Sequence, residues 1–132
     1  MQSAINILVE HGIKPSTYRV QVLHYLQSVM THPTVDEIYK ELHKKNPKLS
    51  RTTIYNIVEL LAKQNIITGL DFKEGYLRYD GTHKMHSHFK CKSCGKIYDI
   101  FDMPQNVKKM LPEGFDLQDI SVSMFGICPK CK

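Results

Sequence analysis

The first half of the chain alternates hydrophobic and polar residues with the spacing of amphipathic helices. Ile5, Leu8 and Val9 mark the hydrophobic face of a first helix. A second helix is predicted to start after Pro15 and Ser16, where a polar residue at the N-cap position precedes hydrophobic positions at helical spacing. These positions are Val22, Leu23, Leu26 and Val29.

Two further helices are predicted with defined starting residues. Thr34 and Glu37 have the spacing of a capping box, in which each side chain satisfies a free amide at the helix start. Ser50 is a suitable N-cap for the fourth helix, and Gly69 lies beyond its end. The hydrophobic stripes consist of Val35, Ile38, Tyr39 and Leu42 in the third helix and of Ile54, Ile57, Val58 and Leu61 in the fourth.

A β-hairpin is predicted directly after the fourth helix. Segments 70–72 and 76–79 contain large hydrophobic residues, and Glu74 and Gly75 between them favour a turn. Helices followed by a two-stranded hairpin are typical of a winged helix-turn-helix, in which the recognition helix enters the major groove and the wing contacts the DNA backbone. The fourth helix is the candidate, because burial of its stripe leaves Arg51, Thr52, Tyr55, Asn56 and Glu59 on the opposite face. The alternative is a solvated helix face without a partner.

The second half of the chain has a different pattern, with short strands around one helix and every cysteine of the sequence. Gly81 and Thr82 are small residues that favour a break between the two halves. We therefore expect an α+β protein with a winged-helix DNA-binding domain at 1–80 and a small α/β domain at 81–132.

Composition narrows the class of protein. The chain has 18 Lys and Arg against 13 Asp and Glu, a formal net charge of +5, which permits nucleic-acid binding without requiring it. No segment approaches the ~18 consecutive apolar residues of a membrane span, and residues 1–30 lack the pattern of a signal peptide. We therefore expect a cytoplasmic protein. In that reducing compartment, two Cys-x-x-Cys pairs bind metal more often than they form disulfides.

The two cysteine pairs predict a structural zinc site. Cys91 and Cys94 form one pair and Cys128 and Cys131 the other, and four thiolates complete a tetrahedral zinc with no open position. A zinc ion with four thiolates carries −2, so the net charge would fall from +5 to +3. The alternative is a thiol redox protein, in which one or both pairs are oxidised and reduced.

A second group of candidate ligands precedes the first cysteine pair. His86 and His88 are two residues apart, so on a strand both imidazoles project from the same face, and Asp80 and Asp99 flank them in sequence. Imidazole and carboxylate ligands suit iron, manganese or zinc. A metallo-hydrolase is an alternative. Against it, the sequence has no acid or base at a motif spacing such as His-Glu-x-x-His.

The order of these motifs resembles the ferric uptake regulator (Fur) family over nearly the whole chain. The matching segments are 31–34, 49–56, 78–80, 86–96 and 128–131. The resemblance implies a homodimeric transcriptional repressor that binds double-stranded operator DNA, with a C-terminal dimerisation domain. It also implies a regulatory metal site made by His32, Asp80, His86, His88 and Asp99. A metal that holds His32 together with ligands of the other domain would select the DNA-binding geometry.

Two details resemble the peroxide-sensing (PerR) branch of that family. Asp99 stands where the iron sensors tend to carry glutamate, and Tyr55 with Asn56 also matches this branch. The resemblance implies that Fe2+ at the regulatory site reacts with peroxide and that the oxidant attacks a ligand histidine, which ends repression. Mn2+ would occupy the site without that chemistry. Ser87 and the lack of a histidine after His88 differ from relatives with a third site, so none is expected. The alternative is an iron- or zinc-responsive repressor without peroxide sensing.

Overall fold

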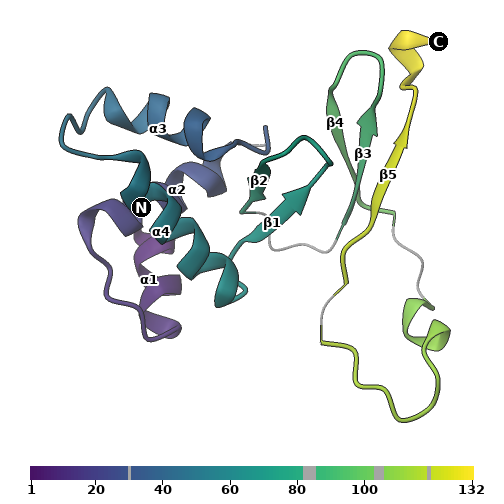
Figure 1. Ribbon diagram of the computed structural model, residues 1–132. Helices are drawn as coiled ribbons and strands as arrows, with labels where there is room; N and C mark the ends of the chain where they lie inside the picture. The colour runs from purple at the N-terminus through teal and green to yellow at the C-terminus, as the bar shows by residue number, and fades with distance from the viewer. Residues whose placement is uncertain (30, 82–85, 103–105, 119) are drawn as a thin grey trace. The chain divides into compact units, whose positions relative to one another are not determined.

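The computed structural model describes residues 1–29, 31–81, 86–102, 106–118 and 120–132 (Figure 1). The chain divides into two compact units, Met1–His83 and Lys84–Lys132. Of the predicted break at Gly81 and Thr82, the second residue lies outside the described residues. Within the described residues, no helix is long and apolar enough to cross a membrane.

The first unit contains the four predicted helices. They are α1 (Gln2–Glu10), α2 (Thr17–Ser28), α3 (Val35–His43) and α4 (Arg51–Lys63). Their hydrophobic faces pack into one core, whose fully buried side chains include Leu8, Leu23, Leu26, Ile38, Ile54 and Leu61.

The hydrophobic face of α1 differs from the prediction. Val9 is 59% exposed, whereas Ala4 and Leu8 are fully buried. Residues four apart lie on the same helix face, while Val9 is turned about 100° away from Leu8. The buried face of α1 therefore follows Ala4 and Leu8, and the placement of Val9 on it was wrong.

The starts of α3 and α4 confirm the predicted caps. The Thr34 hydroxyl accepts a hydrogen bond from the Glu37 amide at 3.2 Å, and the Ser50 hydroxyl accepts one from Thr53 at 3.1 Å. The Glu37 carboxylate does not complete the capping box but lies 3.6 Å from Arg78. At the end of α4, Asn65 adopts a left-handed conformation with φ 58°, while the predicted end marker, Gly69, belongs to a strand.

The predicted hairpin is confirmed. Strands β1 (Thr68–Asp71) and β2 (Leu77–Asp80) pair antiparallel, with Thr68 opposite Asp80 and Asp71 opposite Leu77. Gly75 in the turn has φ +88°, a conformation that glycine adopts without strain. The four helices and this wing form the predicted winged helix-turn-helix (Figure 1).

The second unit is a small mixed sheet with strand order β4-β3-β5. Strand β3 (Ser87–Cys91) lies between β4 (Ile97–Ile100), to which it is antiparallel, and β5 (Ser123–Gly126), to which it is parallel. Where one helix was expected between the strands, the structure has the 3-10 turn η1 (Val107–Met110). Leu111 is extended after it, as a residue before proline prefers. The unit also contains η2 (Pro129–Cys131).

Candidate metal centres and nucleic-acid interface

The four cysteines lie together at one end of the second sheet. Cys91 ends β3, Cys94 follows in the next turn, Cys128 follows β5 and Cys131 lies in η2. All four are free thiols, and their Sγ atoms lie within 4.8 Å of one another. Zinc with Zn–S bonds of about 2.3 Å holds tetrahedral sulfurs about 3.8 Å apart. The 3.9 Å between Cys94 Sγ and Cys128 Sγ fits that geometry.

Local hydrogen bonds shift the pKa values of these thiols. The backbone amides of Cys94 and Cys128 donate to Cys91 Sγ at 3.5 and 3.4 Å and lower the pKa of the Cys91 thiol to about 6. The Tyr98 hydroxyl donates to Cys128 Sγ, which lowers the pKa of Cys128 and raises that of Tyr98 to about 12. A hydrogen bond to Cys128 raises the pKa of Cys131 to about 12. These hydrogen bonds favour the thiolate at Cys91 and Cys128 and the protonated thiol at Cys131.

The predicted regulatory ligands form one group in each unit. In the first unit, His32 Nε2 lies 3.9 Å from Asp80 Oδ2, and both side chains are buried. In the second unit, Nε2 of His86 and Nε2 of His88 each lie 3.5 Å from Asp99 Oδ1. Asp99 is the register partner of His88 across β3 and β4, which explains how residues 11 apart in sequence meet.

These two groups have the chemistry of metal ligands. The His86 and His88 rings have centroids 4.5 Å apart, as expected for two imidazoles on the same face. Two histidines and one carboxylate are the set that holds non-haem Fe(II) with positions left open. Buried imidazoles facing carboxylates also match the donor types for manganese and zinc. Each group alone supplies fewer ligands than these ions usually take.

The turn that carries His32 is attached to the wing. His32 has φ +54°, which is uncommon for a residue other than glycine. Arg78 Nη1 donates to the His32 carbonyl at 3.3 Å, and the Tyr79 amide donates to the Pro33 carbonyl at 2.9 Å. The segment 78–80 is recognisable as a motif in the sequence, but the role of Arg78 is not, because only the fold brings it to residue 32.

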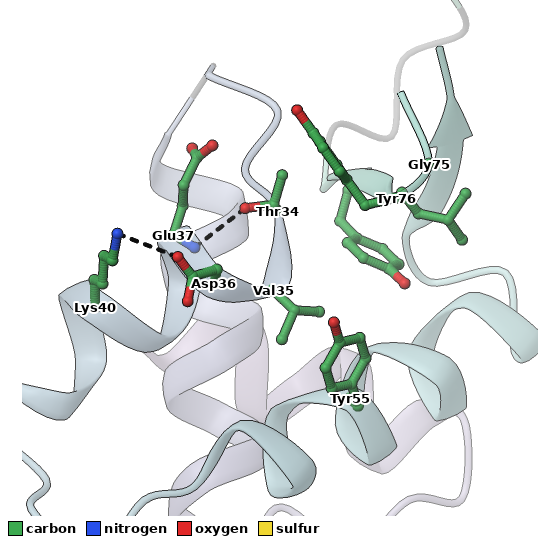
Figure 2. A pocket seen from close by; sticks show the side chains of 10 residues that line it. Thr34, Val35, Asp36, Glu37, Lys40, Tyr55, Gly75 and Tyr76 are labelled. Carbon is green, nitrogen blue, oxygen red and sulfur yellow. Dashed lines mark hydrogen bonds and ion pairs between the residues drawn. The ribbon is translucent and has the colours of Figure 1, made fainter. Parts of the chain in front are cut away.

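The predicted DNA-binding face of α4 is accessible. Arg51, Thr52, Tyr55, Asn56 and Glu59 are all exposed. A pocket of about 770 Å³ lies between this face, the start of α3 and the wing. Figure 2 shows Tyr55 from α4, Thr34 and Val35 at the start of α3, and Tyr76 from the wing around it. Aromatic and charged side chains from α3, α4 and the wing thus line one pocket beside the exposed face of the candidate recognition helix.

Arg51, at the start of α4, already contacts two residues of α3. Its Nε donates to Asp36 Oδ1 at 2.9 Å, and its guanidinium lies 4.1 Å from the centroid of the Tyr39 ring. The pKa of Asp36 is lowered, first by the hydrogen bond from Arg51 and then by that from Lys40. Any contact of Arg51 with a phosphate would therefore compete with Asp36.

Two basic residues that were not predicted from the sequence lie beside Asn56. Lys14 and Arg19 line a hollow of about 410 Å³ together with Thr53 and Asn56. Arg19 Nη1 donates to the Lys14 carbonyl at 3.2 Å across the start of α2. The signal that could have found them is a pair of basic residues flanking a predicted helix start, where backbone amides also attract anions.

Known proteins similar to this chain are regulators that respond to metal or peroxide. The profile of the ferric uptake regulator family matches residues 10–125. The peroxide operon regulator of Bacillus subtilis is 31% identical over 99% of this chain and 92% of its own length. The Helicobacter pylori ferric uptake regulator Fur has a TM-score of 0.75 at 25% identity, over 98% of this chain and 89% of that one. The Campylobacter jejuni peroxide stress regulator has a TM-score of 0.73 at 25% identity, over 98% and 97%.

Proposed function

Because the chain belongs to the ferric uptake regulator family, whose members are metal-responsive regulators, we propose that it is a dimeric repressor released from operator DNA by peroxide. The observation that carries the proposal is the pair of histidines facing Asp99 at 3.5 Å beside a separate four-cysteine cluster. One group is suited to an exchangeable ion with open positions and the other to a closed structural ion.

The four-cysteine cluster is proposed to hold one structural zinc per chain. Cys91, Cys94, Cys128 and Cys131 offer four sulfurs and leave no position for water or substrate. The zinc joins the end of β3 to the segment after β5. It thereby stabilises the domain at 81–132, which we propose to be the dimerisation domain. Hydrophobic side chains exposed in this unit support that role, among them Phe101, Met110, Phe115 and Met124.

The regulatory site is proposed to take ligands from both domains. His32 and Asp80 of the domain at 1–80 would share one Fe2+ or Mn2+ with the second group, which consists of His86, His88 and Asp99. An ion held in this way favours one arrangement of the two domains, and DNA binding selects the same arrangement. Loss of a single ligand therefore weakens DNA binding without any change at the DNA surface.

Peroxide is proposed to act on a ligand histidine. Bound Fe2+ supplies the activation of peroxide at this site. One oxygen atom of the peroxide is added to the imidazole of His32 or His86, and the other leaves as water. The oxidised ring is a poorer ligand, so repression ends. Because the protein is itself modified in this reaction, it is a sensor and not an enzyme.

DNA is proposed to bind along α4. Arg51 and Thr52 lie at the helix start, where contacts to phosphates position a recognition helix, while Tyr55 and Asn56 lie one turn further on to contact base edges. Asn56 has the amide that pairs with adenine in the major groove. Lys14 and Arg19 beside Asn56 add two positive charges for the phosphate backbone.

The decisive experiment compares two metal forms before and after peroxide. Protein loaded with Fe2+ or Mn2+ is tested for binding to a palindromic duplex selected from a random pool. We expect both forms to bind, and only the Fe2+ form to lose binding after brief peroxide exposure. Retention of binding by both forms would favour an iron- or zinc-responsive repressor. Loss in both forms together with cysteine oxidation would favour a thiol redox protein.

A further inference from the structure

Strand β2 of the wing holds the turn at His32 through three consecutive residues. Arg78 donates to the His32 carbonyl at 3.3 Å, Tyr79 donates to the Pro33 carbonyl at 2.9 Å, and the Asp80 carboxylate lies 3.9 Å from the His32 imidazole. A left-handed conformation at a residue other than glycine persists only where its surroundings hold it. The wing therefore fixes both the backbone and the side chain of His32.

The Arg78 guanidinium also reaches two carboxylates. Its Nε and Nη2 donate to the two oxygens of Glu74 at 2.9 and 3.3 Å, and Nη1 lies 3.6 Å from Glu37 Oε1. Glu74 belongs to the wing turn and Glu37 to the first turn of α3. The side chains of Arg78 and Glu74 are only 17% and 12% exposed. Solvent therefore screens this pair less than a surface ion pair.

Only arginine can make this set of contacts. Its planar fork donates to the two carboxylate oxygens of Glu74 and to a carbonyl at the same time. A lysine ammonium carries the same charge, but it is a single point at the end of a flexible stem. The geometry thus depends on the shape of the Arg78 head as well as its charge.

We propose that Arg78 is a positioning residue that couples metal binding at His32 to the conformation of the wing. The inference rests on the proposed function, in which His32 is a ligand of the regulatory metal. A metal that fixes the His32 imidazole also fixes its backbone, and Arg78 transmits that restraint to Glu74 in the wing turn. Because such coupling is reciprocal, a change in the wing turn must alter the affinity for metal. This route lies entirely within the first unit.

The first test is a change in the wing that leaves every proposed ligand intact. Glu74→Gln removes the carboxylate that holds Arg78, and we expect Mn2+ affinity of the full-length protein to fall about five-fold or more. Free Mn2+ is measured by electron paramagnetic resonance during titration. Glu41→Gln is the matched control, because Glu41 is an exposed carboxylate of α3 paired with Lys44 at 3.3 Å. It removes the same charge and should leave Mn2+ affinity unchanged.

A double-mutant cycle separates coupling from a general loss of stability. Arg78→Gln should weaken Mn2+ binding by itself, and adding Glu74→Gln to it should cause no further loss. Arg78→Lys should keep a melting temperature near that of the wild type in the metal-free protein while still binding Mn2+ more weakly. Hydrogen exchange of segment 73–80 should slow on Mn2+ binding in the wild type and in Glu41→Gln, but not in Arg78→Gln.

These measurements distinguish a failure of the proposed regulatory site from a failure of the proposed role of Arg78. If His32→Ala and His86→Ala bind Mn2+ as tightly as the wild type, the proposed regulatory site is wrong and the coupling is wrong with it. If those variants lose Mn2+ but Glu74→Gln behaves like Glu41→Gln, the regulatory site stands and the role of Arg78 is overturned. Additive effects of Glu74→Gln and Arg78→Gln would overturn it as well.

Discussion

Hydrogen bonds to sulfur distinguish three of the four cysteines from one another. Two amides stabilise the Cys91 thiolate, and the Tyr98 hydroxyl stabilises that of Cys128, whereas the pKa of Cys131 is raised to about 12. A zinc ion that binds this cluster therefore has to displace the proton of Cys131. The hydrogen bonds around each sulfur thus influence how much free energy is needed to deprotonate that thiol for zinc binding.

Tyr98→Phe should accelerate zinc loss. The variant removes the hydroxyl that donates to Cys128 Sγ but keeps the aromatic ring, over which Lys96 Nζ lies 4.8 Å from the centroid. Changes in groups that orient metal ligands typically cost ~10–100-fold in metal affinity. Zinc transfer to a coloured chelator measures the effect. Tyr76→Phe in the other unit is the control, and equal rates in the two variants would contradict a role for Tyr98.

Arg51→Ala and Asn56→Ala should have different effects on DNA binding. Loss of a phosphate contact at Arg51 weakens binding to all duplexes and reduces the log-log salt slope by about 0.9. Loss of the Asn56 amide should chiefly relax base preference, because a bidentate contact contributes ~1–3 kcal/mol of discrimination. Affinities for the selected duplex and its single-base variants, measured at several salt concentrations, check both. A similar loss of preference in the two variants would show that the helix face is assigned wrongly.

At the scale of elements, local patterns predicted the helices of the first unit well. Caps and hydrophobic spacing are local properties, so Thr34 and Ser50 are identifiable as helix starts from the sequence alone. Contacts between distant residues could not be predicted. The bridge from Glu37 to Arg78 depends on how α3 and β2 pack. Pairing of His88 with Asp99 depends on the register of the second sheet.

The packing around Gly81 explains why a glycine stands at this position, which the sequence alone does not. The sequence suggested a break between domains, but a Cβ at this position would lie 2.8 Å from the Leu26 carbonyl oxygen. Gly81→Ala should therefore destabilise the first unit by ~1–3 kcal/mol, because a backbone group cannot move aside as a flexible side chain can. Gly69→Ala is the control, since its Cβ would meet Tyr79 at an ordinary 3.6 Å. Urea unfolding measures both, and equal midpoints would refute the packing argument.

At the scale of the whole molecule, the proposed zinc and the dimer depend on each other. The second unit is a three-stranded sheet with exposed hydrophobic side chains, and so small a core supplies little stability. Metal binding to an unformed site contributes its free energy to folding. We infer that the zinc site stabilises the surface through which two chains associate.

Cys94→Ser should therefore remove zinc, dimer and compact second unit together. Structural zinc contributes ~10–16 kcal/mol to the folding of its site, far more than this sheet can replace. Zinc content by mass spectrometry and molecular mass by light scattering are measured on the same sample. Lys92→Ala changes an exposed residue of the same turn; it is the control and should retain one zinc per chain. A zinc-free Cys94→Ser protein that remains a folded dimer would refute the structural role.

Oxidation by peroxide should be found on histidine and not on cysteine. Peroxide activated at the proposed regulatory site would react with the nearest group, so His32 or His86 should gain one oxygen atom. Thiolates held by zinc in a closed site are less available to peroxide than free thiolates of low pKa.

Mn2+ in place of iron should abolish the modification and preserve DNA binding. Asp99→Glu should weaken the peroxide response more than metal-dependent binding, because a longer carboxylate on β4 would change how the proposed site holds an ion beside His86 and His88. Peptide mass mapping decides the matter, and oxygen found only on the four cysteines, with DNA released, would replace this mechanism by a thiol switch.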